Sequence, residues 1–203
     1  MKDLFAFLVI VTMLVLACRY IYQIHRHKIT PTLSTWIIFF IGTGLSLLTY
    51  ALAEKHDFKS GILSVMDTAA VASILCAILV WGNRDMRFKP FEKWYLVGVG
   101  AIISYGLISG DARGSNIFTQ VLISVGYVPT IQNLITEKKN TESFTAWGCA
   151  LTAGIFGLYP ALVEDGNSLA AIYSIRTIIL VFIMLCLMAY YEFSHNKPAA
   201  ARR

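Results

Sequence analysis

The sequence predicts an all-α membrane protein with seven transmembrane helices. Of its 203 residues, 57% are hydrophobic and only 14% are charged, whereas soluble domains average about 45–50% apolar and about 25% charged residues. Apolar stretches follow one another along the chain, most of them with about the 20 residues that a helix needs to cross a bilayer. This composition argues against a soluble enzyme. The net charge of +5 also lies on too apolar a chain for a disordered or nucleic-acid-binding protein.

Each apolar stretch is expected to form one helix. The first should remain as an uncleaved helix, because Lys2 and Asp3 cancel where a signal peptide begins with positive charge. The fourth is marginal in length at its outer end. Charged residues, Gly and Pro separate the stretches and mark the loops. In chain order the seven stretches are Leu4–Ile24, Leu33–Ala53, Gly61–Trp81, Trp94–Ser109, Asn116–Thr136, Phe144–Val163 and Ser168–Tyr191.

The distribution of Lys and Arg predicts the orientation in the membrane. Twelve of the 17 fall on one side of the predicted membrane, four fall on the other, and Arg176 lies inside a helix. The side with the excess is expected in the cytoplasm, which puts the N-terminus outside and the C-terminus inside. The tryptophans agree, because all four fall at cytoplasmic ends of helices, where interfacial anchors are expected. They are Trp36, Trp81, Trp94 and Trp147.

The first three and the last three helices look like two copies of one unit. Tyr20–Ile24 resembles Tyr127–Ile131, a basic loop follows each, and Trp36 then corresponds to Trp147. A tandem copy of three helices would be inverted, so the fourth helix is needed to restore the orientation. Parallel repeats of this kind are one known plan for transporters. The predicted parts are the first repeat 1–82, linker helix 83–112, second repeat 113–192 and cytoplasmic tail 193–203.

Two segments of the second repeat resemble a PQ-loop motif. Gly126–Ile131 and Lys138–Trp147 follow its pattern, in which a Pro-Gln step ends one helix and a basic, Ser/Thr-rich loop leads to a tryptophan. With the 3+1+3 plan, the chain resembles the SWEET and PQ-loop transporter superfamily over nearly its whole length. The motif is altered in both copies, because Thr130 follows Pro129 and no proline precedes Gln23.

The resemblance implies alternating access between two parallel three-helix bundles. SWEET-like proteins typically carry a hinge proline in each of four helices around the core. This chain offers only Pro129 and Pro160, both in the second repeat. Hinge motion is therefore expected mainly in the second bundle.

Asp67 and Arg176 are the only acid and the only base well inside the predicted spans. A charge at the bilayer centre costs at least ~2.5–3.5 kcal/mol, so each should face an interior or a cavity. They occupy matching positions in the two repeats, and the resemblance implies that they lie opposite each other in a substrate pocket. A charged pair would suit a zwitterion, or an anion bound to Arg176 with Asp67 taking a proton. A structural salt bridge is the alternative.

Other polar residues are weaker candidates for the pocket. Gln120 and Tyr127 lie on a polar stripe of the fifth helix, and Ser174 lies on the seventh. Such side chains in membrane helices often bond neighbouring helices instead. The histidines lie in or beside loops and the cysteines lie singly in apolar runs, so we expect no catalytic residues, metal or cofactor.

The sequence as a whole favours a carrier of a small polar solute, such as a sugar or an amino acid. We expect it in the plasma membrane, with a bacterial inner membrane as the setting. Its expected partners are the solute and the lipid bilayer, with no nucleic acid, and the sequence is compatible with a homo-oligomer. A ligand-binding membrane receptor on the same PQ-loop fold is the alternative, and nothing in the sequence supports an enzyme.

Overall fold

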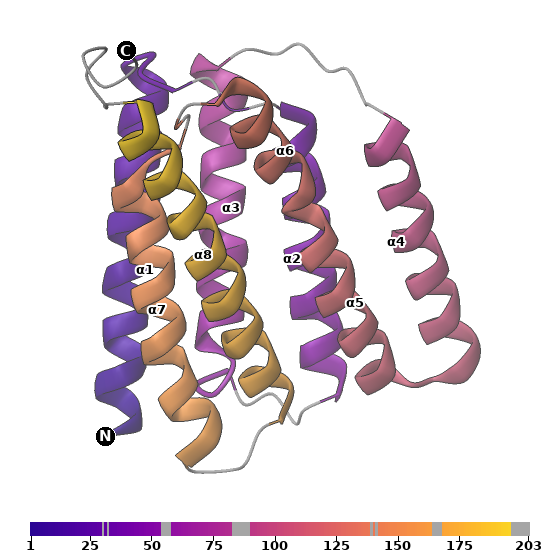
Figure 1. Ribbon diagram of the computed structural model, residues 1–203. Helices are drawn as coiled ribbons and strands as arrows, with labels where there is room; N and C mark the ends of the chain where they lie inside the picture. The colour runs from indigo at the N-terminus through magenta and orange to yellow at the C-terminus, as the bar shows by residue number, and fades with distance from the viewer. Residues whose placement is uncertain are drawn as a thin grey trace.

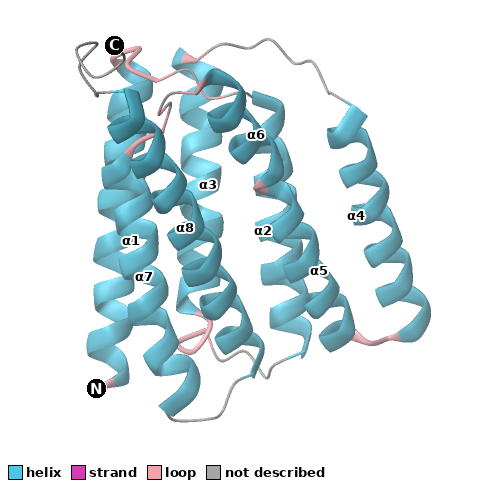
Figure 2. Ribbon diagram, viewed as in Figure 1, coloured by secondary structure: helices cyan, strands magenta, loops and turns pink. Residues whose placement is uncertain are grey.

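The fold is known from a computed structural model that describes residues 1–29, 31, 33–53, 58–82, 90–138, 140, 142–163 and 168–195. All regular secondary structure in these ranges is helical (Figure 2). The helices are α1 (Lys2–His25), α2 (Leu33–Ala53), α3 (Ile62–Trp81), α4 (Pro90–Ser109), α5 (Ala112–Gly126), α6 (Val128–Glu137), α7 (Phe144–Val163) and α8 (Ser168–His195). The predicted basic loop 83–89, the loop 164–167 and the tail beyond 195 lie outside the described residues.

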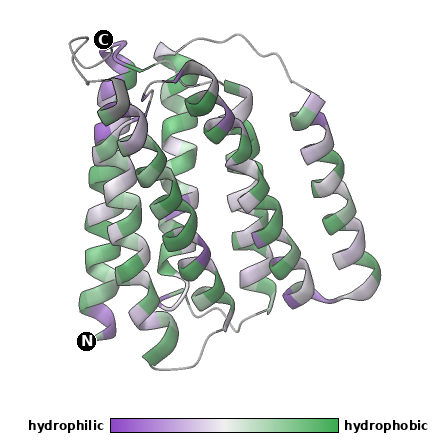
Figure 3. Ribbon diagram, in the orientation of Figure 1, coloured by the Kyte–Doolittle hydropathy of each residue, from purple (hydrophilic) through white to green (hydrophobic). Residues whose placement is uncertain are grey.

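Several helices carry the apolar surface of a membrane-embedded protein. Within the described ranges, α1, α2, α3, α7 and α8 are long and apolar enough to cross a bilayer, and α4 contains a shorter apolar stretch, Lys93–Ser109. Large apolar side chains face outward along the bundle, among them Leu107 and Ile108 with 82% and 87% of their surface exposed. Hydrophobic residues cover much of every long helix (Figure 3). Such a surface is stable in lipid and costly in water.

The predicted single helix over Asn116–Thr136 is wrong, because the chain breaks there into α5 and α6 at Tyr127. Pro129 lies in the first turn of α6. It has no N–H to donate to the carbonyl of Val125, four residues earlier, and its ring crowds that carbonyl. The helix therefore stops and restarts with a change of direction, and α6 continues beyond the end of α5 (Figure 1).

Helix α4 begins at a proline and is followed by a glycine turn. It begins at Pro90, four residues before the predicted start, and proline suits the first helical turn, where its missing N–H costs nothing. After α4 the chain turns at Gly110, whose φ of +66° favours glycine. Asp111 then caps α5 by accepting the Gly114 N–H at 2.8 Å.

The helices pack in a repeated order. Helix α3 contacts both α1 and α2, while α8 contacts both α7 and α5. The two groups meet where α1 packs on α7 and where α2 packs on α5. Helix α4 contacts α2 and α5 at one edge of the bundle (Figure 1). Successive long helices alternate in direction, so the C-terminal ends of α1, α3, α6 and α8 lie together.

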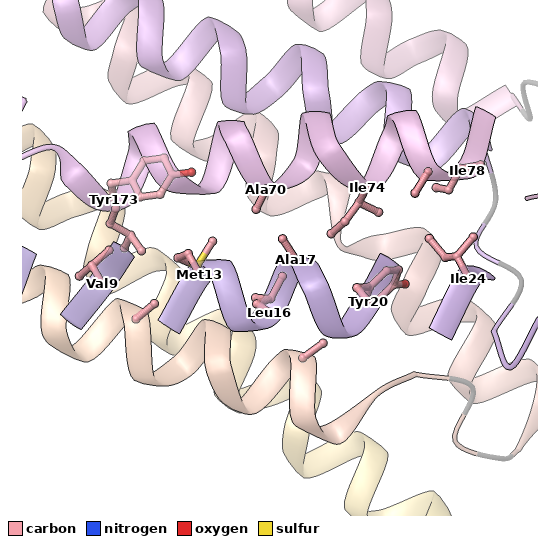
Figure 4. Close-up of a cluster of buried hydrophobic side chains, with 14 of the residues drawn as sticks. Val9, Met13, Leu16, Ala17, Tyr20, Ile24, Ala70, Ile74, Ile78 and Tyr173 are labelled. Atoms are coloured by element: carbon pink, nitrogen blue, oxygen red, sulfur yellow. The ribbon is translucent and has the colours of Figure 1, made fainter. Parts of the chain in front are cut away.

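A core of small and branched side chains joins α1 to α3. Ala17, Tyr20 and Ile24 of α1 face Ala70, Ile74 and Ile78 of α3 (Figure 4). The three α3 residues are each at most 5% exposed. Small residues such as Ala17 and Ala70 allow the two helices to approach closely, which is how membrane helices gain packing energy.

Candidate functional site

A cavity of about 530 Å³ lies inside the bundle. Every described helix except α4 contributes to its wall. At one end it reaches Ile29 and Pro31, between α1 and α2, and Glu142, just before α7. Deeper in the bundle it reaches Asp67, in the second turn of α3. A volume of this size is typical of small-molecule sites.

The opposite end of the bundle is nearly filled. Beyond Asp67 lies a second cavity of only about 10 Å³, enough for about one water molecule. Asn116 of α5 donates to the Ser46 carbonyl at 2.8 Å and to the Thr49 hydroxyl at 2.9 Å, both on α2. Ser60 donates to the carbonyl of Pro160 on α7 at 3.3 Å. These contacts close the bundle on the side of the α2–α3 connection.

The structure brings Asp67 and Arg176 together through Tyr173. The Tyr173 hydroxyl donates to Asp67 at 2.5 Å, and the Arg176 guanidinium lies 4.5 Å from the centre of the Tyr173 ring. No direct ion pair joins Asp67 to Arg176. Asp67 lies on the cavity wall, whereas Arg176 is 9% exposed and is not among the described residues that line it. Its Nε and Nη1 atoms are buried without hydrogen-bond partners.

The other predicted site residues are divided between the cavity and the helix interfaces. Tyr127 lines the cavity at the α5–α6 break. Gln120 donates to the Ser46 hydroxyl at 2.7 Å and so belongs to the α2–α5 contact. Ser174 is 1% exposed and packs opposite Gly157 of α7. Neither Gln120 nor Ser174 is among the lining residues of the main cavity.

The two predicted hinge prolines have different surroundings. Pro129 lies at the α5–α6 break, next to Tyr127 and Thr130 of the cavity wall. Pro160 lies within α7, which continues through it to Val163. The break at Pro129 therefore adjoins the site directly, while Pro160 lies at the filled end.

Sequence reasoning singled out Tyr127 but missed four other aromatic side chains around the cavity. Tyr20 lies 5.1 Å from Trp36, which lies 6.0 Å from Phe39, measured between ring centres. Phe39 lies 5.5 Å from Tyr127, and Tyr127 lies 5.8 Å from Trp147. All five line the cavity. Trp36 and Trp147 were expected to be interfacial anchors, and their matching order after Tyr20 and Tyr127 in the two repeats is the signal that could have placed them here.

Glu142 closes this aromatic group into a ring. Its Oε2 atom accepts from the Trp147 indole N–H at 3.2 Å and from the Tyr20 hydroxyl at 3.5 Å. Burial raises the pKa of Glu142, and the two hydrogen bonds partly oppose that shift. We call the five aromatic side chains the aromatic cluster; they are Tyr20, Trp36, Phe39, Tyr127 and Trp147. Glu142 links the two ends of this cluster.

The chemistry of the cavity follows from its lining. The described lining residues include two acids, Asp67 and Glu142, and no Lys, Arg, His, Asn or Gln. In the described part of the chain, no group of three or more His, Cys, Asp or Glu side chains could hold a metal ion. The lining thus combines apolar and aromatic surface with a few polar groups, which is the usual composition of a small-molecule site.

Comparisons with protein families, with curated proteins and with solved structures give no match to this chain.

Proposed function

We propose that the protein is a membrane carrier of a small polar solute that works by alternating access. The observation that carries this proposal is the form of the cavity. It lies between the two halves of the chain, reaches Glu142 at one end and gives way to close packing beyond Asp67. A carrier needs such a site near the midplane, accessible from one side at a time.

The packing order supports two equivalent three-helix units. In the first, α3 lies between α1 and α2; in the second, α8 lies between α7 and the α5–α6 segment. The contacts between the units correspond in the same way, since α1 meets α7 and α5 meets α2. We infer a 3+1+3 arrangement of the SWEET and PQ-loop type, in which α5 and α6 together make one crossing and α4 is the linker. Rocking of one unit against the other would then open the end that is filled here.

The proposed setting is the plasma membrane, with the N-terminus outside and the cavity reaching the cytoplasmic end. The orientation can be tested with single cysteines at Lys28 and Asp111, in a background without the native cysteines. An impermeant maleimide should label the Asp111 variant in intact cells and the Lys28 variant only after permeabilisation. Labelling of the Lys28 variant in intact cells would reverse the orientation.

Uptake into proteoliposomes tests the transport function. A panel of radiolabelled sugars, amino acids and organic ions should include at least one solute that accumulates faster than in protein-free vesicles. The alternative function, a ligand-binding receptor on the same fold, predicts saturable binding to the purified protein without uptake. Binding without uptake for every solute that binds would therefore reject the carrier.

A further inference from the structure

The cavity wall is acidic and aromatic. Asp67 and Glu142 are the charged residues of the described lining, and the five side chains of the aromatic cluster also belong to it. Arg176 stands behind Tyr173, outside the lining, and offsets one of the two carboxylates. With both acids ionised, the described lining residues and Arg176 together carry one net negative charge.

Among the described residues, each carboxylate has hydrogen-bond partners on only one of its two oxygens. Glu142 uses only Oε2 for its bonds to Trp147 and Tyr20, and Asp67 uses only Oδ2 for its bond to Tyr173, within the described part of the chain. In both cases every donor found is a neutral N–H or O–H group. The donors hold the carboxylates in place without neutralising them, so the unused oxygens can accept from, or lie beside, a positive ligand.

The aromatic side chains supply the second part of a cation site. The faces of Trp and Tyr attract cations within about 6 Å, most strongly where water is excluded. Here Tyr20 and Trp36 come from α1 and α2, while Tyr127 and Trp147 come from the second half of the chain. Two pairs of rings on opposite halves, with Glu142 between them, would surround a bound ligand. Beside the two acids, the described lining supplies Thr and Tyr hydroxyls and Trp indole N–H groups, but no amide side chain of the kind that often binds sugar hydroxyls.

We propose that the solute of this site is a monovalent organic cation, held by the aromatic cluster and by the carboxylates of Glu142 and Asp67. The proposal rests on the carrier function for its physiological meaning but not for its test. A quaternary or substituted ammonium group, or a positively charged heteroaromatic ring, would lie against the aromatic faces. Its charge would balance that net negative charge.

Binding to the purified full-length protein in detergent tests this proposal. The probes are choline, tetramethylammonium and N-methylpyridinium chlorides, compared with sodium chloride at equal ionic strength. The matched neutral probe is 3,3-dimethylbutan-1-ol, which has the shape of choline without its charge. Intrinsic tryptophan fluorescence and the thermal midpoint should respond saturably to at least one cation and not to the neutral analogue. An equal response to the analogue, or no saturable response to any of the three cations, would overturn the proposal.

Two variants locate the site. Glu142→Gln removes the charge and Trp36→Leu removes a ring, so each should weaken binding of the responding cation by about fivefold to thirtyfold. Glu192→Gln, on the exposed end of α8, is the matched control and should bind as the wild type does. Trp36→Leu also serves where Glu142→Gln folds poorly. Unchanged affinity in a folded variant of either kind would reject the site.

The binding test separates this proposal from the carrier function. Cation binding without uptake rejects the carrier and keeps the cation site. Uptake of a neutral or anionic solute, with no binding of the cations, keeps the carrier and rejects the cation site.

Discussion

The ring of Tyr127 lies 5.8 Å from the ring of Trp147, at an interplanar angle of 55°. Tyr20 and Trp36 show the same relationship, at 5.1 Å and 54°. In each pair the tyrosine precedes a loop that contains basic residues, and the tryptophan lies in the first turns of the next long helix. The two contacts are equivalent under the repeat that the sequence predicts. Two such similar contacts are what the predicted repeat leads us to expect, and the repeat itself stays a prediction.

Gly61 tests the packing of the filled end. A Cβ atom at Gly61 would overlap the ring of Tyr50, which is 2% exposed and has little room to move. Gly61→Ala should lower the free energy of unfolding by about 1–3 kcal/mol, the usual cost of overpacking. Gly44→Ala is the control, because no atom lies within 4 Å of a Cβ there and alanine favours the helix. Thermal unfolding of both variants in detergent checks this, and equal stability would show that Tyr50 does not pack on Gly61.

The sequence could predict most of the helices, because each apolar stretch is interrupted by charged residues, Gly or Pro. The sequence also singled out Asp67 and Tyr127 as candidates for a substrate pocket; both line the cavity, and their role stays a prediction. It could not place Gln120, since a polar side chain on a membrane helix serves a helix contact or a cavity equally well, and only the packing of α2 on α5 decides. Nor could it place Glu142, whose role depends on which rings the fold brings to it.

The expected charge pair illustrates the same limit. Matching positions in two repeats predict that Asp67 and Arg176 are close, but the side chain between them depends on helix rotation. Tyr173 lies one turn before Arg176 on α8 and takes the place of a direct ion pair. Side-chain directions on facing helices are fixed by packing, which a single sequence does not reveal.

The hydrogen bond from Tyr173 to Asp67 gives the next prediction. Tyr173→Phe keeps the ring beneath Arg176 but removes the only donor to Asp67 in the described structure. Loss of a hydrogen bond to this half-buried carboxylate should cost about 1–3 kcal/mol in the free energy of unfolding. Tyr190→Phe, on the exposed part of α8, should cost little and is the control.

A double-variant cycle with Asp67→Leu makes this prediction specific. The cost of Tyr173→Phe should shrink when Asp67 is already absent, because no orphaned carboxylate remains. The measurement is chemical unfolding of the four proteins in the same detergent. Additive effects would show that the two side chains do not interact.

The break at Pro129 predicts a separation of transport from folding. Pro129→Ala restores the N–H that can donate to Val125, so α5 and α6 should join into a straighter helix. If the break permits rocking, uptake should fall about tenfold or more, a change of about 1.4 kcal/mol in the barrier. Thermal stability should be retained or raised. Pro90→Ala is the control, because Pro90 begins α4 far from the cavity wall. Wild-type uptake in the Pro129 variant would remove the hinge role.

Glu142 predicts how stability depends on pH. Burial raises its pKa above the ordinary 4.5, although bonds from Trp147 and Tyr20 partly oppose this. A carboxyl group with a raised pKa binds its proton more tightly in the folded state than in the unfolded state. Its stabilising contribution is therefore complete below the unfolded pKa and is lost as the pH rises through the raised value.

Glu142→Gln stays neutral and should lack this loss. The thermal midpoints of the wild type and the variant, measured from about pH 4 to about pH 8, should diverge upward from the ordinary carboxyl range. Glu192→Gln should follow the wild-type profile, since that side chain is exposed at the end of α8. Parallel profiles for the wild type and Glu142→Gln would show that the Glu142 carboxylate is solvated and does not pack against the aromatic cluster.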